Sequence, residues 1–416
     1  MSAKEGTDEG PLSRNRDFVI LWVGGAVSEL GTSMSQLVFP IIGYAITHST
    51  VQAGLATTGL VLGEVVLRLP AGALVDRVAR SRVLLVTNLA AAAVYGSLAV
   101  AVLAGHLTLA HLVAAGFLSG AADAFAAPAT SATVRTIVPT TQLPLAYTRL
   151  EARTRAVHLV GPPLGGALYS LARPVPFLVD AVSYAAEALA ITRLRTPLPA
   201  PIRERRSIVA DIGEGLRFVW DHVGVRAMMV WGGLINLTGG FAFVAVTLRL
   251  IQAGTRPAAI GLVETAAAFA GLIGALIAPL IISRAPTGLT AICLTLINAA
   301  LLVPLAWTTN VVATGALLAA GTFLIPANNA GISAYMVSVV PDELQGRVNS
   351  AAGFISNGLA PLGPVLAGVA LAALGGGALI LGAALTAATV VPLVASQTIR
   401  SLGRPDTWAA EGVDSA

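Results

Sequence analysis

The sequence predicts an all-α membrane protein in which twelve transmembrane helices form two six-helix bundles related by pseudo-symmetry. Hydrophobic residues make up 56% of the 416-residue chain and charged residues only 11%, whereas soluble domains carry about 25% charged residues. Apolar runs recur from residue 18 to residue 396, each near the roughly 20 residues that a spanning helix needs. Helices are expected because an open sheet leaves backbone groups unsatisfied in lipid. An internal repeat predicts the two bundles.

Turn signals such as Gly105-His106 and Arg173-Pro174 separate the expected spans. The run that begins at Phe18 is too long for a signal-peptide core, so we expect it to be retained as the first helix. The twelve spans are expected at about residues 18–46, 52–75, 83–104, 109–130, 150–171, 175–192, 226–251, 257–283, 288–308, 311–332, 348–373 and 375–396.

Basic residues predict which side of the membrane each loop faces, because cytoplasmic loops carry an excess of lysine and arginine. With a cytoplasmic N-terminus, all but four of the 25 basic residues lie on the cytoplasmic side. We therefore expect a multi-pass protein of the cell membrane with both termini cytoplasmic. Residues 1–192 would form the first bundle, 193–225 a cytoplasmic linker, and 226–416 the second bundle with a short tail.

The linker contains one segment with helical periodicity. From Asp211 to His222, the apolar residues Ile212, Leu216, Val219 and Trp220 are spaced to lie on one face of a helix. An amphipathic helix lying at the cytoplasmic membrane surface is expected, either as a plain connector or as a functional element.

The two halves match at an offset of 202 residues. Gly72-Ala73-Leu74 corresponds to Gly274-Ala275-Leu276, and Gly161-Pro162 corresponds to Gly363-Pro364. One ungapped offset over several loops and spans indicates duplication of a six-helix unit, which is the architecture of alternating-access carriers.

The segment from Gly72 to Arg82, here called the hinge, joins two spans and resembles a loop of a known family. Its Gly72, Asp76, Arg77 and Arg80 match the loop between helices 2 and 3 of the major facilitator superfamily, with Ala79 in place of the usual glycine. Gly161-Pro162-Pro163-Leu164-Gly165-Gly166 resembles that family's antiporter signature. The chain as a whole resembles the multidrug, macrolide and siderophore exporters of this superfamily.

The resemblance implies that the hinge is a cytoplasmic gate formed by Gly72, Asp76, Arg77, Arg80 and Arg82. Asp76 is expected to contact the positive N-terminal end of the span that begins after Gly346-Arg347. The alternative is a plain topology signal. At the 202-residue offset, Ala278 and Pro279 occupy the Asp76 and Arg77 positions, which predicts a one-sided latch.

Carboxylates inside the spans are candidates for coupling, since an ionisable group in hydrocarbon is costly. The resemblance implies that helices 1, 4, 7 and 10 line a central cavity, so we expect Glu29 and Asp123 to face it and to couple protons or substrate. Glu64 and Arg68 lie one helical turn apart and are expected to pair, with Arg68 shared with Glu29. A structural ion pair is the alternative for Glu64 and Arg68. The polar residues expected to line the cavity are Gln36, Asn236, Asn328 and Asn329.

Other motifs have weaker functional implications. Gly161, Pro162, Gly165 and Gly166 are expected to act as a gating motif, with tight packing as the alternative. Glu187 is expected to have a packing role, Glu264 is not assigned, and His158 is expected to be a packing or loop residue. Because the chain has no phosphate-binding Gly-x-x-x-x-Gly-Lys-Ser/Thr motif and no visible catalytic set, we expect neither ATP-driven transport nor an enzyme. No cofactor and no metal site are expected.

The predicted function is export of a small, largely hydrophobic compound, such as a drug, an antibiotic or a siderophore-like metabolite, by proton antiport through alternating access. Two alternatives remain at this point: an importer or symporter of the same fold, and a membrane receptor that does not transport. The expected partners are a small-molecule substrate, protons and the lipid bilayer, with no nucleic acid, and the chain is expected to be a monomer.

Overall fold

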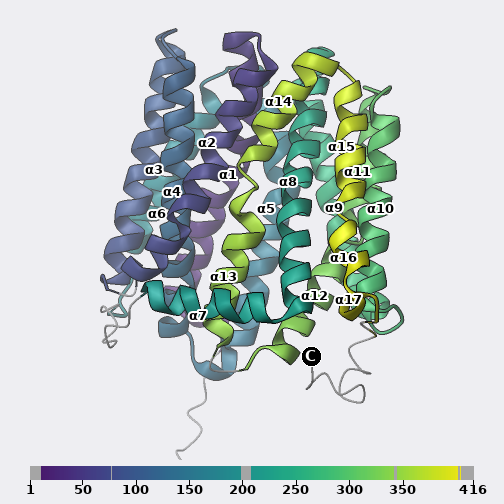
Figure 1. The fold of residues 1–416 in the computed structure, drawn as a ribbon. Helices are drawn as coiled ribbons and strands as arrows, with labels where there is room; N and C mark the ends of the chain where they lie inside the picture. The colour runs from purple at the N-terminus through teal and green to yellow at the C-terminus, as the bar shows by residue number, and fades with distance from the viewer. Residues whose placement is uncertain (1–10, 76, 198–207, 342–343, 402, 404–416) are drawn as a thin grey trace, which may run out of the picture.

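The computed structural model describes residues 11–75, 77–197, 208–341, 344–401 and 403, and all regular structure in these residues is helical (Figure 1). The helices of the first half are α1 (Arg16–Thr47), α2 (Thr50–Val75), α3 (Arg80–Leu103), α4 (Leu109–Ile137), α5 (Leu143–Leu171) and α6 (Val175–Ile191). Those that follow are α7 (Ile208–Asp221), α8 (Val223–Gln252), α9 (Pro257–Ile282), α10 (Thr287–Leu305), α11 (Val311–Thr322), α12 (Ile325–Val339), α13 (Gln345–Gly358), α14 (Leu362–Leu374), α15 (Gly377–Ala388), α16 (Val391–Ala395) and α17 (Gln397–Ser401). Two short 3₁₀ helices, η1 (Leu12–Arg14) and η2 (Thr140–Gln142), precede α1 and α5.

Three of the expected spans are each divided into two helices. The breaks lie between α11 and α12, between α13 and α14, and between α15 and α16. Pro326, Pro361 and Pro392 lie at or beside the helix starts that follow these breaks. Proline has no backbone N–H to donate and clashes with the preceding turn, so it interrupts the helical hydrogen bonds there.

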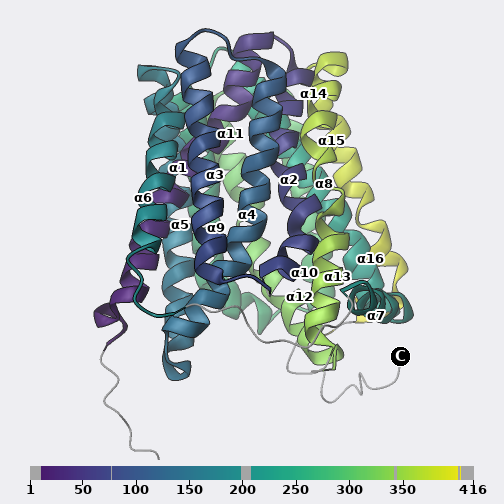
Figure 2. The same ribbon diagram turned by 90° about the vertical axis from the view of Figure 1, so that its left-hand side faces the viewer.

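Ten segments of the described residues are long and apolar enough to cross a membrane, and the divided helices count as one segment each. α6 is outside this group because it has only 17 residues. α5 is also outside it, and its first half carries Arg149, Glu151, Arg153 and Arg155. Both lie alongside the other long helices (Figures 1 and 2). α4 and α5 are longer than the expected spans because charged and polar turns extend them beyond their apolar stretches.

All loops between the long helices lie at two opposite ends of the molecule. One end carries α7 and the starts of α1 and α8, and is here called the α7 end; the opposite end, at the starts of α2, α4, α9 and α11, is called the far end (Figure 1). The helices of the first half pack mainly on one another, and so do those from α8 onward. The two halves meet where α2 packs on α14 and where α5 packs on α9.

The repeat between the two halves has two registers. α4 and the α11–α12 pair both begin and end 202 positions apart, as the sequence offset predicts. α2 and α9 each have 26 residues, but they begin and end 207 positions apart. The prediction that Ala278 and Pro279 occupy the positions of Asp76 and Arg77 is therefore wrong, because the equivalent residues are Ser283 and Arg284. The sequence matches in this region came from the alanine, glycine and leucine content that the spans share.

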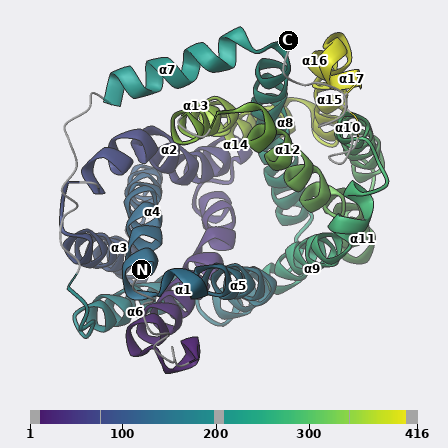
Figure 3. The same ribbon diagram turned by 90° about the horizontal axis from the view of Figure 1, so that it is seen from below.

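α7 lies across the α7 end and packs against α13 (Figures 1 and 3). The expected amphipathic helix is thus present, with slightly different bounds. Gly215 allows close approach, since a Cβ there would lie 2.5 Å from the Arg347 carbonyl oxygen. Glu214 forms an ion pair with Arg347, while Trp220 is 69% exposed. One face of α7 therefore holds the start of α13, and Trp220 projects outward.

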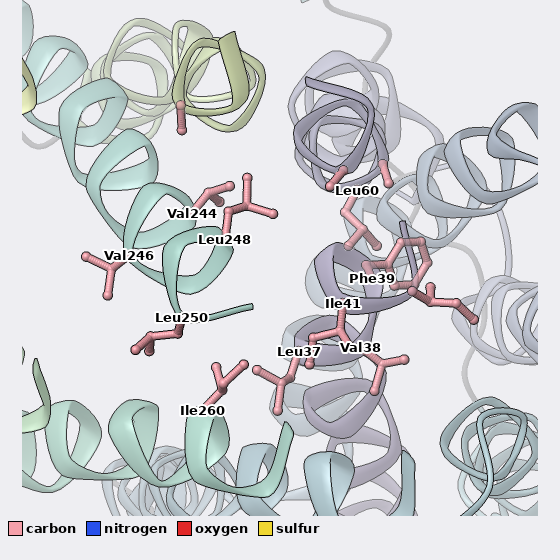
Figure 4. Packing of buried hydrophobic residues seen from close by; sticks show 14 of the residues in the cluster. Leu37, Val38, Phe39, Ile41, Leu60, Val244, Val246, Leu248, Leu250 and Ile260 are labelled. Carbon is pink, nitrogen blue, oxygen red and sulfur yellow. The ribbon is translucent and has the colours of Figure 1, made fainter. Parts of the chain in front are cut away.

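One large apolar cluster extends across both halves. It includes Leu37 and Ile41 of α1, Val244 and Leu248 of α8, and Ile260 of α9. Figure 4 shows Leu37 and Ile260 pointing toward one another from opposite halves. Close packing of these side chains stabilises contact between the halves through van der Waals attraction, since lipid tails are as apolar as leucine.

Candidate functional site

A central cavity of about 970 Å³ lies between the two halves of the molecule. Its walls come from α1, α2, α4 and α5 on one side and from α8, α9, α11, α12, α13 and α14 on the other. These helices surround the middle of the molecule when it is seen from the α7 end (Figure 3). The first, fourth, seventh and tenth membrane spans, which were expected to line the cavity, all do so as α1, α4, α8 and α11–α12. The second, fifth, eighth and eleventh spans, which are α2, α5, α9 and α13–α14, contribute as well.

The cavity is closed at the far end by two pairs of helices that touch backbone to backbone. On the α2–α14 side, Thr50 Oγ1 donates to the Gly368 carbonyl at 2.8 Å, and a Cβ at Gly54 would collide with the Pro364 carbonyl. On the α5–α9 side, a Cβ at Gly261 would lie 2.5 Å from the Pro162 carbonyl oxygen. Glycine is needed at these positions because a side chain would separate the helices.

The cavity is open toward the α7 end. Glu151 and Arg155 line it from the first half of α5, and their side chains are 63% and 49% exposed. Thr154 and His158 line the same wall, so the expectation that His158 is only a packing or loop residue is wrong. Closure at the far end and exposure of this wall place an entrance to the cavity at the α7 end in this conformation.

The Gly-Pro motif of α5 contacts two different helices. Gly161 lies against Ser33 and Gly165 against Met34, both on α1. Gly166 lies against the Pro257 carbonyl and Pro162 against Gly261, both on α9. The motif therefore joins packing within the first half to the contact that closes the far end.

Replacing Gly166 by leucine is expected to open the far end, because the new side chain would collide with the backbone of Pro257. Overpacking of this kind costs about 1–3 kcal/mol, which corresponds to roughly a 5- to 150-fold shift in the ratio of conformers. The distance between spin labels at Leu171→Cys and Val312→Cys, in a Cys293→Ser background, measures the opening. Both label sites are 80% exposed.

Gly239→Leu is the matched control, since nothing lies within 4 Å of a Cβ at Gly239. This control is expected to leave the distance between the labels unchanged. An unchanged distance in Gly166→Leu would show that the α5–α9 contact does not hold the far end closed.

Two of the predicted coupling carboxylates line the cavity. Asp123 does so from α4, and its Oδ1 accepts a hydrogen bond from the Tyr184 hydroxyl at 3.5 Å. The Tyr184 hydroxyl is also 2.7 Å from Thr32 Oγ1. Glu64 lines the cavity from α2, and its Oε1 lies 3.4 Å from Nη2 of Arg68. The expected pairing within α2 is present, but both side chains are about half exposed, so the pair contributes little stability.

Glu29 is not among the residues that line the cavity, and its partner is not Arg68. Glu29 Oε2 accepts a hydrogen bond from Arg153 Nε of α5 at 3.0 Å. Gly25 leaves the space that the guanidinium occupies. The expectation that Glu29 faces the cavity and shares Arg68 is wrong because α1 runs obliquely, from the outer edge at the α7 end to the middle at the far end (Figure 3). Gln36, two turns further along, does line the cavity.

Of the three predicted asparagines, one lines the cavity. Asn236 does so from α8, and its Nδ2 donates to the Ser356 carbonyl at 2.8 Å. Asn328 is buried with no hydrogen-bond partner for its Oδ1, and Asn329 is exposed outside the cavity. The break between α11 and α12 explains the error, since it directs Ile325 and Pro326 to the cavity instead.

The hinge is described except for Asp76, which lies outside the described residues, so its predicted contact stays a prediction. Arg80 begins α3, and its Nη1 donates to Thr136 Oγ1 of α4 at 2.6 Å and to the Ala132 carbonyl at 3.3 Å. Arg77 and Arg82 are exposed, and Gly72 is partly buried near the end of α2. Arg80 therefore holds the start of α3 against α4.

Sequence reasoning did not assign Glu264, which lines the cavity from α9. The 207-residue register, which the helix bounds reveal, pairs Glu264 with Thr57 of α2, another lining residue. Within the described part of the chain, no group of three or more His, Cys, Asp or Glu side chains is placed to hold a metal ion.

Comparison with known proteins identifies the family of this architecture. Residues 21–364 match the family model described as Major Facilitator Superfamily. The chain is 27% identical over 383 residues to the multidrug efflux pump Tap of Mycolicibacterium fortuitum, a match that covers 87% of this chain and 89% of Tap.

Solved structures show the same fold at low sequence identity. A mutant form of the nucleoside transporter NupG is 12% identical with a TM-score of 0.72, over 91% of this chain and 99% of NupG. A bacterial homologue of the iron transporter ferroportin, in an inward-facing state, is 15% identical with a TM-score of 0.68, over 91% and 98% of the two chains.

Proposed function

Since the chain belongs to the major facilitator superfamily of membrane transporters, we propose that it exports a small hydrophobic compound in exchange for protons. The likeness to a multidrug efflux pump supports export, and the largely apolar wall of the cavity supports a hydrophobic substrate. The positive-inside distribution of arginine supports a cell-membrane protein with the α7 end in the cytoplasm. In that orientation the structure is an inward-facing conformer.

The observation that carries the proposal is the cavity itself. It has carboxylates in an otherwise largely apolar wall, it is open at the α7 end, and it lies beneath a closed far end. Leu37, Val61 and Phe243 supply apolar surface, while Asp123 supplies a group that can hold a proton or face a substrate. A cavity of this size accommodates a drug-sized molecule.

The polar residues that the sequence predicted in the cavity have proposed roles in the cycle. Asp123 alternates between a protonated form and a carboxylate that favours substrate, and the Tyr184 hydroxyl orients it by donating to Oδ1. Glu64 tunes the charge of the cavity, with Arg68 as its neighbour. Gln36 and Asn236 offer hydrogen bonds to the substrate. Proton and substrate thus compete for one cavity, and this competition couples their movements in opposite directions.

The proposed gates lie at opposite ends of the cavity. At the far end, Pro162 and Gly166 allow α5 to close against α9, while Gly161 and Gly165 seat α5 against α1. At the α7 end, the hinge residues Gly72, Asp76, Arg77, Arg80 and Arg82 form the gate that closes in the outward-facing state. α7 holds the start of α13, the helix that Asp76 is predicted to contact, because Glu214 pairs with Arg347.

A flux measurement tests the proposal. A susceptibility panel in a host that lacks its own pumps identifies an exported compound, and its uptake is then followed in inside-out vesicles. An acidic lumen is expected to drive accumulation, and collapse of the pH gradient is expected to release the compound. Accumulation in the opposite direction would identify an importer, and binding without flux would identify a receptor; either result would reject the proposal.

A further inference from the structure

Glu264 is a carboxylate in the second half of the chain, and one of its oxygens has no polar partner in the described residues. It lies on α9, two turns from the helix start at Pro257, and lines the central cavity. Its Oε1 is shielded from solvent and accepts no hydrogen bond. An unpaired oxygen of this kind is unusual, because buried polar groups normally have partners.

Glu264 lies directly beneath the contact that closes the far end. One turn earlier on α9, Gly261 packs against the Pro162 carbonyl of α5. The next residue, Thr265, donates from Oγ1 to the Leu159 carbonyl of α5 at 2.8 Å. Glu264 is therefore bracketed by two contacts that join α9 to α5.

Within the described residues, Glu264 forms no ion pair with a basic side chain. On α5, Arg155 lines the same cavity but pairs with Glu151 at 2.8 Å, and His158 is the other titratable residue of that wall. The described sequences of α11 and α12 contain no Asp, Glu, Lys, Arg or His.

The remaining charged groups near α9 are on other helices or at its start. α8 carries Arg249 in its last turn, and the guanidinium lies beside Gly376, near the far-end loops. Arg256 precedes α9 and is exposed. Asp123 and Glu64 face the cavity from the first half and have the same sign of charge as Glu264.

The physical consequence is a link between protonation and the far-end gate. Glu264 is partly buried, and its ionised form is disfavoured while Oε1 is shielded and unpaired, whereas the protonated acid is tolerated. Separation of α5 from α9 would admit water to this oxygen and remove that penalty. The carboxylate therefore favours the open far end and the protonated acid favours the closed far end.

We propose that Glu264 is a proton-binding site of the far-end gate, and that a proton bound from the far side allows α5 and α9 to close over it. The proton comes from water at the open far end and converts the carboxylate to the acid. After closure it leaves to water at the α7 end, through the cavity, which restores the carboxylate and favours reopening. The proposal rests on proton antiport as the proposed function and assigns the step at which the proton acts.

The test measures the far-end distance directly and needs no substrate. Spin labels at Leu171→Cys and Val312→Cys, in the Cys293→Ser background, are measured in nanodiscs in mildly acidic and mildly alkaline buffer. The labelled protein that keeps Glu264, here called the parent, is expected to shift in acid toward the short distance between labels, which marks the closed far end. The ratio of closed to open populations is expected to change by at least about tenfold. Glu264→Gln, which is permanently neutral, is expected to give the short distance in both buffers. Glu264→Asp is expected to restore the response.

Two outcomes would overturn the proposal: a parent protein that shows no response to pH, or a Glu264→Gln variant that responds as strongly as the parent. Failure of the proposed function has a different signature, namely vesicles that show no accumulation driven by a pH gradient. The distance measurement is independent of that result, so the two failures are distinguishable.

Discussion

Replacing Asp123 by asparagine is expected to abolish accumulation driven by a pH gradient, to the level of vesicles without the protein and by at least about tenfold. Asp123 lines the cavity and has only the Tyr184 hydroxyl, at 3.5 Å, as its hydrogen-bond partner in the described structure. Asparagine keeps the size and most of the polarity but cannot exchange a proton. Uptake of the compound into acidic inside-out vesicles measures the effect.

The matched control is Glu187→Gln, which makes the same chemical change in the same half of the molecule. Glu187 accepts a hydrogen bond from Ser28 and is not among the residues that line the cavity. This control is expected to retain gradient-driven uptake. If Asp123→Asn also retained it, the coupling role proposed for Asp123 would be wrong. Substrate exchange without a gradient shows whether the variant still binds and moves the compound.

Replacing Arg153 by methionine is expected to cause a large loss of stability. Arg153 pairs with Glu29 at 3.0 Å, and the two side chains are only 12% and 24% exposed. Arg153 also donates to the Trp22 carbonyl at 3.3 Å. Removal of one member leaves a largely buried charge without a partner, which typically costs about 3–5 kcal/mol. Thermal unfolding in detergent, at a fixed heating rate, measures the loss.

Two further variants separate charge from packing. The double variant that combines Glu29→Gln with Arg153→Met removes both charges. It is expected to recover much of the stability that Arg153→Met alone loses. Arg155→Met breaks an exposed pair on the same helix, between Arg155 and Glu151, and is expected to cost only about 0–1 kcal/mol. Equal losses for Arg153→Met and Arg155→Met would show that the Glu29–Arg153 pair does not anchor α1 to α5.

These experiments also decide the role of Glu29. Its placement between α1 and α5 favours a structural ion pair, in contrast to the coupling role expected from the sequence. If the double variant folds and still accumulates substrate in response to a pH gradient, Glu29 is not required for coupling. Loss of gradient-driven uptake in a stable double variant would instead support the coupling role.

Local properties of the sequence determined the class of the protein and the composition of its cavity. Apolar runs of membrane-spanning length predicted the helices, because each helix satisfies its own backbone in lipid. Arginine-rich loops and the repeat predicted the topology and the duplicated bundle. Asp123, Glu64, Gln36 and Asn236 were found because a polar residue within an apolar span has few places to face other than a cavity.

Relations between helices were decided only by the tertiary structure. The oblique path of α1 brings Glu29 to Arg153, although the spacing of Glu29 and Gln36 puts both on one helical face. The five-residue difference in register between α2 and α9 became visible only from the helix bounds. Glu264 was not assigned because its position along α9 suggested the membrane surface. It lies in the wall of the central cavity instead, with one oxygen shielded, because helix tilt and packing decide which side of α9 faces the cavity.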